Sequence, residues 1–208
     1  MPLYIDLSHP ISDNMPVYPG DTPVSLQQTA SLEVEGHTNF TLSTGMHSGT
    51  HLDGPMHLTS SLTRIADLPL EQFSGKGFLF NVVGQKTIDL PESAFSHVTP
   101  GSVVLFYTGF DLYFGQKQYY QSYPSISENT ALILVKKQVN IVGMDSPSPD
   151  YEPFNIHHIL LNNHVLITEN LTNLSALLPY REFELLAFPL RIKADSSPVR
   201  VVARIDHT

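Results

Sequence analysis

The stretch that most constrains the fold reads His47-Ser48-Gly49-Thr50-His51-Leu52-Asp53-Gly54-Pro55-Met56-His57. Its residues capable of metal or proton chemistry all have odd numbers: His47, His51, Asp53 and His57. Because side chains alternate faces along an extended chain, an extended conformation would direct all four the same way. Gly49 and Pro55 fall on that face and place no bulky side chain there.

A helix is the competing conformation, since His47 and His51 have His-x3-His spacing. Gly49, Gly54 and Pro55 are poor helix residues and exclude it. In a fully extended chain these two histidines would lie roughly 13 Å apart, at about 3.3 Å per residue, too far to share an ion. We therefore expect a bend at Gly49, because glycine reaches backbone angles closed to other residues.

Two histidines and a carboxylate are ligands that suit zinc, with manganese or iron as alternatives. Three protein ligands leave a position for water, and a catalytic zinc ion supplies hydroxide from that water at neutral pH. His57 is then free to act as general base and later as general acid. The alternative is a polar surface strand or a set of hydrogen-bonded core residues, but the clustered spacing favours a metal site.

The motif His47-x-Gly49-Thr50-His51-x-Asp53-x-Pro55-x-His57 resembles, at every fixed position, the signature of the cyclase family of metal-dependent hydrolases, which includes bacterial kynurenine formamidase. Weaker resemblances over residues 6–11, 16–21, 107–109, 143–148, 188–190 and 197–200 extend it along nearly the whole chain. The resemblance implies one α/β domain over residues 1–208, of the swivelling β/β/α kind with a mixed sheet and short helices. It also implies a homodimer or homotetramer.

Further ligands follow from the same resemblance. In the formamidases, the first two histidines and the aspartate of the motif hold one zinc ion, and the aspartate bridges to a second. A histidine at a helix start and a glutamate twelve residues later complete the site, which here selects His157 and Glu169, with His158 as the alternative histidine. From the residues alone, Glu169 could equally favour the N-terminus of a following helix, and either histidine could face solvent.

The loop Pro16-Val17-Tyr18-Pro19-Gly20-Asp21 departs from the formamidase pattern. The formamidases have a tryptophan that lines the substrate pocket where this chain has Tyr18. We expect Tyr18 to contact the substrate, and its smaller, hydroxylated ring indicates that the substrate can differ from N-formylkynurenine. The alternative is a tyrosine that only packs against the prolines of the loop.

The net charge of −9 is uneven, because residues 1–63 hold six acidic residues and no Lys or Arg. This pattern argues against nucleic-acid binding, which requires basic surface. It suits a cation in the N-terminal third, or simply a soluble acidic surface. No apolar run approaches the roughly 20 residues of a membrane span, and the N-terminus has no signal-peptide pattern. The chain has no cysteine, which excludes disulfides and thiolate metal sites, and we expect a cytoplasmic protein.

Strand-like and helix-like segments alternate, which predicts an α/β or α+β fold. The tyrosine-rich stretch 113–123 is expected to be a packed surface loop, with an oligomer contact as the alternative. Helices are expected from the N-cap Ser127 to about residue 137, over 155–163 and over 171–178. Strands are expected over 4–8, 24–32, 37–44, 77–83, 102–107, 140–143, 165–168, 182–190 and 199–205, with 24–32 and 37–44 half-buried.

We therefore predict a hydrolase of an amide-like C–N bond that acts on a small molecule, either an aryl formamide or a small cyclic amide or imide. Metal-bound hydroxide would attack the carbonyl, and His57 would transfer the proton. A metal- or ligand-binding protein without catalysis and a metal-dependent lyase are the alternatives on the same scaffold. No phosphate loop, dinucleotide fingerprint or nucleophile elbow occurs in the sequence.

Overall fold

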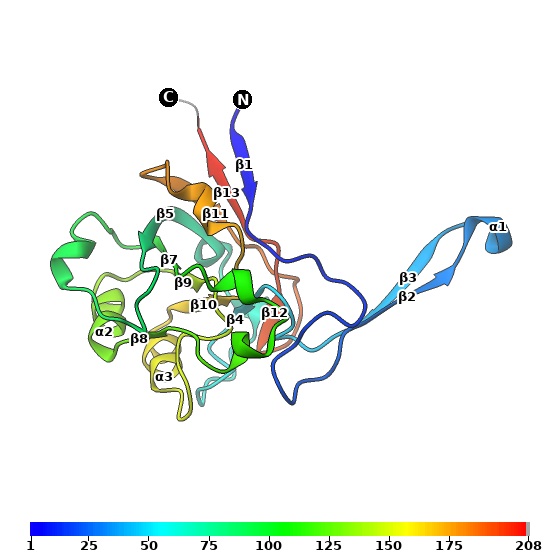
Figure 1. Ribbon diagram of the computed structural model, residues 1–208, viewed down its shortest axis with the longest axis horizontal. Helices are drawn as coiled ribbons and strands as arrows, with labels where there is room; N and C mark the ends of the chain where they lie inside the picture. The colour runs from blue at the N-terminus through cyan, green and yellow to red at the C-terminus, as the bar shows by residue number, and fades with distance from the viewer. Residues whose placement is uncertain (207–208) are drawn as a thin grey trace.

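The computed structural model describes residues 1–206 and is built around a nine-stranded mixed sheet (Figure 1). In spatial order its strands are β1 (Leu3–Asp6), β13 (Val202–Ile205), β11 (Phe183–Leu186), β5 (Ser74–Asn81), β7 (Val103–Tyr107), β9 (Ile141–Met144), β10 (Leu166–Glu169), β4 (His51–Asp53) and β12 (Ser196–Pro198). Neighbours within β5-β7-β9-β10 run parallel, and all other neighbours run antiparallel.

Two helices, α2 (Glu128–Lys136) and α3 (Asn155–Asn162), cover one face of the parallel strands. The predicted N-cap is confirmed, because the Ser127 hydroxyl accepts a hydrogen bond from the backbone N–H of Thr130. Leu134 of α2 and Leu160 of α3 are fully buried in one core cluster with the sheet side chains of Val104 and Val142. The apolar spacing of both helices therefore faces the sheet.

The other face of the same strands is also buried. Leu105 and Ile141 point away from the two helices into a second core cluster, which Leu52 of β4 and Leu185 of β11 complete. Parallel strands that are covered on both faces have continuous apolar sequences, as the segments around 103–106 and 141–144 do.

Among residues 1–206, no helix is long and apolar enough to span a membrane.

A hairpin projects away from this body (Figure 1). It consists of β2 (Ser25–Ala30), the short helix α1 (Leu32–Glu35) at the tip, and β3 (Asn39–Ser43), and we call it the arm. The strands β6 (Thr87–Ile88) and β8 (Ser125–Ile126) form a separate two-stranded parallel sheet. Short 3-10 helices form at Ile65–Asp67, Leu70–Phe73, Glu92–Phe95, Phe110–Tyr113, Lys117–Tyr120 and Leu174–Leu177.

The mixed α/β class is confirmed, but several element predictions need correction. The helix predicted over 171–178 is one 3-10 turn, Leu174–Leu177. The strand predicted over 182–190 ends at Leu186, ahead of Pro189, which lacks an N–H for ladder pairing. The strands predicted over 24–32 and 37–44 form, but every residue of β3 is exposed rather than half-buried. The sequence did not predict β6, β8, β12 or α1, and β4 was not delimited within the extended stretch considered for residues 47–57.

The tyrosine-rich stretch 113–123 packs against the sheet edge that carries the histidine motif. Tyr119 is fully buried, and its hydroxyl donates a 2.8 Å hydrogen bond to Asn170 Oδ1. The Phe114 ring stacks on His9 with 3.8 Å between centroids. This stretch therefore supplies side chains to the surroundings of the motif.

Candidate functional site

The histidine motif bends where the sequence predicts it. Gly49 has a φ of +61°, a backbone conformation that favours glycine, and a Cβ atom there would also displace the terminal methyl group of Met15. The fully extended conformation considered for 47–57 is wrong outside His51–Asp53, because turns occupy the flanking residues. Within β4 the side chains of His51 and Asp53 point the same way, as alternation requires.

Five side chains from three segments of the chain converge at β4. His47 Nδ1 lies 2.9 Å from Asp53 Oδ1, and His51 Nε2 lies 3.5 Å from the same oxygen. Strand β10 pairs with β4 so that Glu169 is opposite His51, and Glu169 Oε2 lies 3.3 Å from His51 Nε2. His157, in the first turn of α3, brings its Nε2 to 3.2 Å from Glu169 Oε1. The adjacent His158 is exposed and points away from this cluster.

The potential ligand atoms form two overlapping groups. His47, Asp53 and His57 offer atoms within 4.8 Å of one another, and so do His51, Asp53 and Glu169. Asp53 belongs to both groups. The geometry thus offers Asp53 as a shared ligand, and it also places His57 within reach of the first group.

Unpaired buried atoms test whether a metal ion fits this cluster. His51 Nε2, both carboxylate oxygens of Asp53 and Glu169 Oε1 are buried and make no hydrogen bond of good geometry, although they lie close to one another and to the other histidines of the cluster. Burying polar atoms in this way costs free energy unless something compensates for it. A divalent cation compensates for it, and imidazole nitrogen with carboxylate oxygen is a donor set that divalent metals accept. The residues fit a metal ion.

Asp150, which the sequence analysis missed, orients one histidine. Its Oδ1 lies 2.6 Å from His157 Nδ1, and its Oδ2 accepts the backbone N–H of Ile156 at the start of α3. This carboxylate therefore holds His157 with Nε2 toward the cluster, as outer carboxylates do in metal sites. The sequence feature that could have revealed Asp150 is an acidic residue shortly before the start of a helix. His51 is held comparably, with Nδ1 at 2.9 Å from the carbonyl oxygen of Gly49.

Asp195 is a second carboxylate that the sequence analysis missed. Its Oδ2 lies 2.9 Å from His47 Nε2 and 3.3 Å from His57 Nδ1. Strand β12 follows directly and pairs with β4, which brings Asp195 beside the motif from a distance of more than a hundred residues. No local pattern in the sequence marks this residue. Its contact with His57 Nδ1 leaves Nε2 as the second ring nitrogen available for proton transfer.

Burial and charge set different pKa values for these histidines. Burial lowers the pKa of His57, although the Asp53 carboxylate opposes the shift, so the ring is neutral at pH 7 and can accept a proton. Burial would also lower the pKa of His157, but Asp150 and Glu169 outweigh it and raise that pKa to about 10. Protons and metal ions therefore compete for His157.

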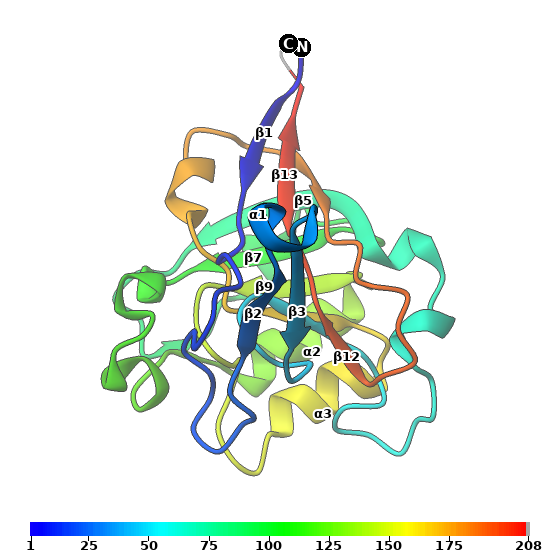
Figure 2. The same cartoon turned by 90° about the vertical axis from the view of Figure 1, so that its right-hand side faces the viewer.

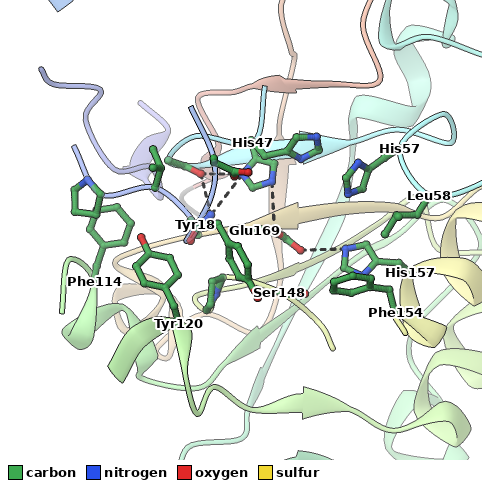
Figure 3. A pocket seen from close by; sticks show the side chains of 17 residues that line it. Tyr18, His47, His57, Leu58, Phe114, Tyr120, Ser148, Phe154, His157 and Glu169 are labelled. Carbon is green, nitrogen blue, oxygen red and sulfur yellow. Dashed lines mark hydrogen bonds and ion pairs between the residues drawn. The ribbon is translucent and has the colours of Figure 1, made fainter. Parts of the chain in front are cut away.

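A cavity of about 230 Å³ opens onto the cluster (Figure 3). His57, His157 and Glu169 line one side, and Tyr18 and Tyr120 line another. The Tyr18 and Tyr120 rings meet edge to face with 5.8 Å between centroids. Tyr18 thus lines the cavity rather than only packing within its loop. Further lining comes from Phe114, Leu58, Ser148 and Phe154.

Comparison with known proteins agrees with this geometry. The family model named Cyclase matches residues 5–151. The chain belongs to the cyclase family. Kynurenine formamidase of Bacillus cereus is 29% identical over 206 residues, which cover 97% of each chain. Kynurenine formamidase of Bordetella avium is 30% identical over 204 residues, which cover 96% of each chain.

Solved structures confirm the cyclase fold. An isatin hydrolase bound to the product analogue thioisatinate has a TM-score of 0.88 at 19% identity, covering 99% of this chain and 93% of the other. A structure titled a potential metal-dependent hydrolase with cyclase activity has a TM-score of 0.80 at 23% identity, covering 100% of both. The cyclase family model stops at residue 151, before His157 and Glu169. The fold itself brings these two residues to the motif.

Proposed function

We propose that this cyclase-family chain is a metal-dependent hydrolase of an amide-like C–N bond in an aryl formamide or a small cyclic amide or imide. The observation that carries the proposal is the cluster of buried His51, Asp53 and Glu169 atoms without hydrogen-bond partners, beside a cavity that His51 and Glu169 line. Relatives named kynurenine formamidase and isatin hydrolase support this class of bond. Hydrolysis of C–N bonds other than peptide bonds is the shared chemistry.

As the resemblance to the formamidases implies, His47, His51 and Asp53 would hold one ion, and Asp53, His157 and Glu169 would hold a second; the two groups in the structure share Asp53 in the same way but place His51 with Glu169. Zinc is the proposed metal and manganese the alternative, because imidazole and carboxylate ligands suit both. A metal ion bound there supplies a Lewis acid and lowers the pKa of a coordinated water. Asp150 and Asp195 keep the histidine rings oriented through their outer nitrogens.

His57 moves the proton in this proposal. Its Nδ1 faces Asp195, so a proton on Nδ1 is held there and Nε2 is the basic atom. Nε2 takes the proton from the attacking water and delivers it to the nitrogen of the leaving group. The lowered pKa of His57 supplies the neutral ring that this first transfer needs.

The aromatic wall of the cavity binds and orients the substrate. Tyr18 and Tyr120 offer ring faces and edges across the cavity from His57, and Phe154 adds a ring beside His157 (Figure 3). Aromatic side chains favour stacked or edge-to-face contact with a planar ring. The small cavity suits a small molecule as the partner. A cytoplasmic location and a homodimeric or homotetrameric assembly stay predictions.

Metal content and turnover together test the proposal. Protein purified without chelator should contain about one or two zinc or manganese ions per chain by elemental analysis and should hydrolyse an N-formyl arylamine. His157→Ala should lose metal, whereas the matched control His158→Ala should retain both metal and activity. Metal without turnover would instead indicate a binding protein. Product formed without incorporation of labelled oxygen from water would indicate a lyase.

A further inference from the structure

Asn170 is a buried polar residue beside the ligand cluster that the proposed reaction leaves unused. It follows Glu169 at the end of β10, lines the cavity and is 6% exposed. Its φ is +54°, a left-handed conformation that asparagine adopts more readily than most residues. Its N–H donates to the carbonyl oxygen of Ser146, and its own carbonyl oxygen accepts the Thr50 hydroxyl. The side-chain amide therefore extends from a firmly held backbone.

The amide of Asn170 takes part in the hydrogen bonding that holds His51. Its Nδ2 donates to the carbonyl oxygen of Gly49 at 3.0 Å, and the same oxygen lies 2.9 Å from His51 Nδ1. Nδ2 is also 3.5 Å from His51 Nδ1. Because a carbonyl oxygen has two lone pairs, Gly49 accepts both N–H groups at once. This arrangement keeps His51 Nε2 directed toward Asp53 and Glu169.

The hydroxyl of Tyr119 stabilises this orientation of the amide. It donates to Asn170 Oδ1 at 2.8 Å, and residues 1–206 supply no other donor to that oxygen. Without the hydroxyl, Oδ1 would be buried and unpaired, which is unfavourable. An amide turned by half a rotation would instead place Oδ1 against the carbonyl oxygen of Gly49, so that two acceptors face each other. Oδ1 would then compete with Gly49 for the proton on His51 Nδ1 and draw the ring out of its position.

The ring of Tyr119 also touches the aromatic wall of the cavity. It meets Tyr120 edge to face with 5.1 Å between centroids, and Phe114 edge to face with 5.4 Å. Both of those rings line the cavity. In Figure 2 the green segment that contains the 3-10 turn Lys117–Tyr120 lies at the outer edge of the body, whereas the Tyr119 side chain is fully buried. One inward-pointing side chain of a surface segment thus joins the cavity wall to the surroundings of His51.

We propose that Tyr119 is a positioning residue for the metal centre, acting through the amide of Asn170 on His51. The inference rests on the proposed function, because His51 serves as a ligand only where the cluster holds a metal ion. It extends that function by giving the buried tyrosine of a surface segment a role in metal affinity. The hydroxyl carries this role, since the ring alone cannot fix which way the amide faces.

Hydrogen exchange of the Asn170 side-chain amide, followed by NMR on the metal-free chain, tests the link from Tyr119 to Asn170. The N–H donated to Gly49 should exchange slowly in wild type, because it is buried and hydrogen-bonded. Tyr119→Phe keeps the ring and should accelerate this exchange by at least about tenfold, as loss of one hydrogen bond does. Tyr113→Phe is the matched control in the same stretch, since the Tyr113 side chain is 39% exposed, and it should leave the rate unchanged. An Asn170 amide that exchanges as slowly in Tyr119→Phe as in wild type would overturn the proposal.

Zinc affinity, measured by competition with a chelator, tests the link from Asn170 to His51. Tyr119→Phe should raise the zinc dissociation constant roughly three- to tenfold, less than the 10–100-fold that a direct outer partner of a ligand contributes. Asn170→Gly, which suits the left-handed backbone at this position, should lose at least as much affinity. Adding Tyr119→Phe to Asn170→Gly should then have no further effect, because the amide through which the hydroxyl acts is gone. A loss that adds in full on top of Asn170→Gly would show that Tyr119 only supports the fold, and would overturn the proposal.

The same measurement separates this inference from the proposed function. Wild type that takes up no zinc would contradict the proposed function, and the role of Tyr119 at the metal centre with it. Wild type that binds zinc, together with a Tyr119→Phe variant of equal affinity, would leave the proposed function standing and overturn this inference alone.

Discussion

His57 lies beside the candidate metal ligands, with its Nδ1 3.3 Å from Asp195 Oδ2. We predict that His57→Ala lowers kcat by roughly 10²–10⁴-fold, the usual contribution of a general acid–base group. Because His47, His51 and Asp53 remain, the metal content should stay near that of wild type. Steady-state kinetics and elemental analysis on the same preparation measure both quantities.

The geometry also defines the opposite outcome, since His57 lies in one potential ligand group with His47 and Asp53. Loss of metal together with activity in His57→Ala would make this histidine a ligand rather than the proton carrier. Asp53→Asn is the comparison that should lose metal, because Asp53 belongs to both groups.

Asp145 gives a residue-scale prediction about pH. Its carboxylate accepts hydrogen bonds from the Thr108 hydroxyl and from the backbone N–H groups of Thr108 and Gly109. Burial nevertheless raises its pKa to about 6, from an ordinary value of 3.8. A carboxyl group whose pKa rises on folding stabilises the protein fully below about pH 4, and this contribution disappears as the pH rises through 6.

Urea unfolding of wild type and Asp145→Asn from pH 4 to pH 7 should reveal this loss. The free energy of unfolding of wild type should fall relative to the variant, by at most about 3 kcal/mol for a pKa shift of this size. The comparison between the two proteins cancels the other titrating groups. A difference that stays constant over this range would show that Asp145 does not titrate there.

The residues of the candidate site differ in how far the sequence could reveal them. The spacing of His47, His51 and Asp53 was informative because every second residue of an extended chain shares a face, although His47 lies in the turn before β4. His157 and Glu169 came only from the resemblance, since nothing local separates Glu169 from an ordinary helix-start acid. Asp195 reaches His47 and His57 only through the pairing of β12 with β4, a contact that no single segment encodes.

At the scale of elements, the sequence predicted the helices whose formation depends on residues close together in the chain. The N-cap at Ser127 and the apolar spacing of α3 predicted two helices that the structure contains. The strand β12 reads Ser-Ser-Pro and is held by β4, so its own sequence carries no strand signal. The arm shows the reverse case, because its alternation predicted two strands that do form, but the half-burial predicted with them is wrong for β3, whose residues are all exposed.

Close packing of β5 leads to a prediction about one glycine. A Cβ atom on Gly75 would collide with the backbone carbonyl oxygen of Gly101, which cannot move aside as a flexible side chain can. Gly75→Ala should therefore lower the free energy of unfolding by about 1–3 kcal/mol, as overpacking does. Urea unfolding measures the change.

Gly45→Ala is the matched control for this prediction. Its added Cβ would meet only Ser48 Oγ at 3.5 Å, an ordinary contact, so its stability should match or slightly exceed that of wild type. Equal stability of the two variants would mean that the turn containing Gly101 shifts at little cost.

At the scale of the whole molecule, the candidate site joins the two halves of the chain. The motif on β4, the start of α3 and the end of β10 meet only when the central sheet is complete. The sequence predicted the fold class and the motif residues of this cluster, and the family resemblance added His157 and Glu169, but the strand order that unites them rests on pairings between distant segments. Metal binding should consequently be coupled to folding of the whole sheet.

This coupling predicts that metal removal lowers thermal stability. A ligand that binds only the folded chain stabilises it by about 2.7 kcal/mol when its free concentration is a hundred times its dissociation constant. For a chain of this size, that corresponds to a rise in Tm of roughly 5–10 °C. Calorimetry of chelator-treated protein, with zinc returned to one sample, should show this rise for wild type and for His158→Ala. Asp53→Asn should show none, because the carboxylate shared by both ligand groups is lost; an equal rise in Asp53→Asn would place the metal elsewhere on the chain.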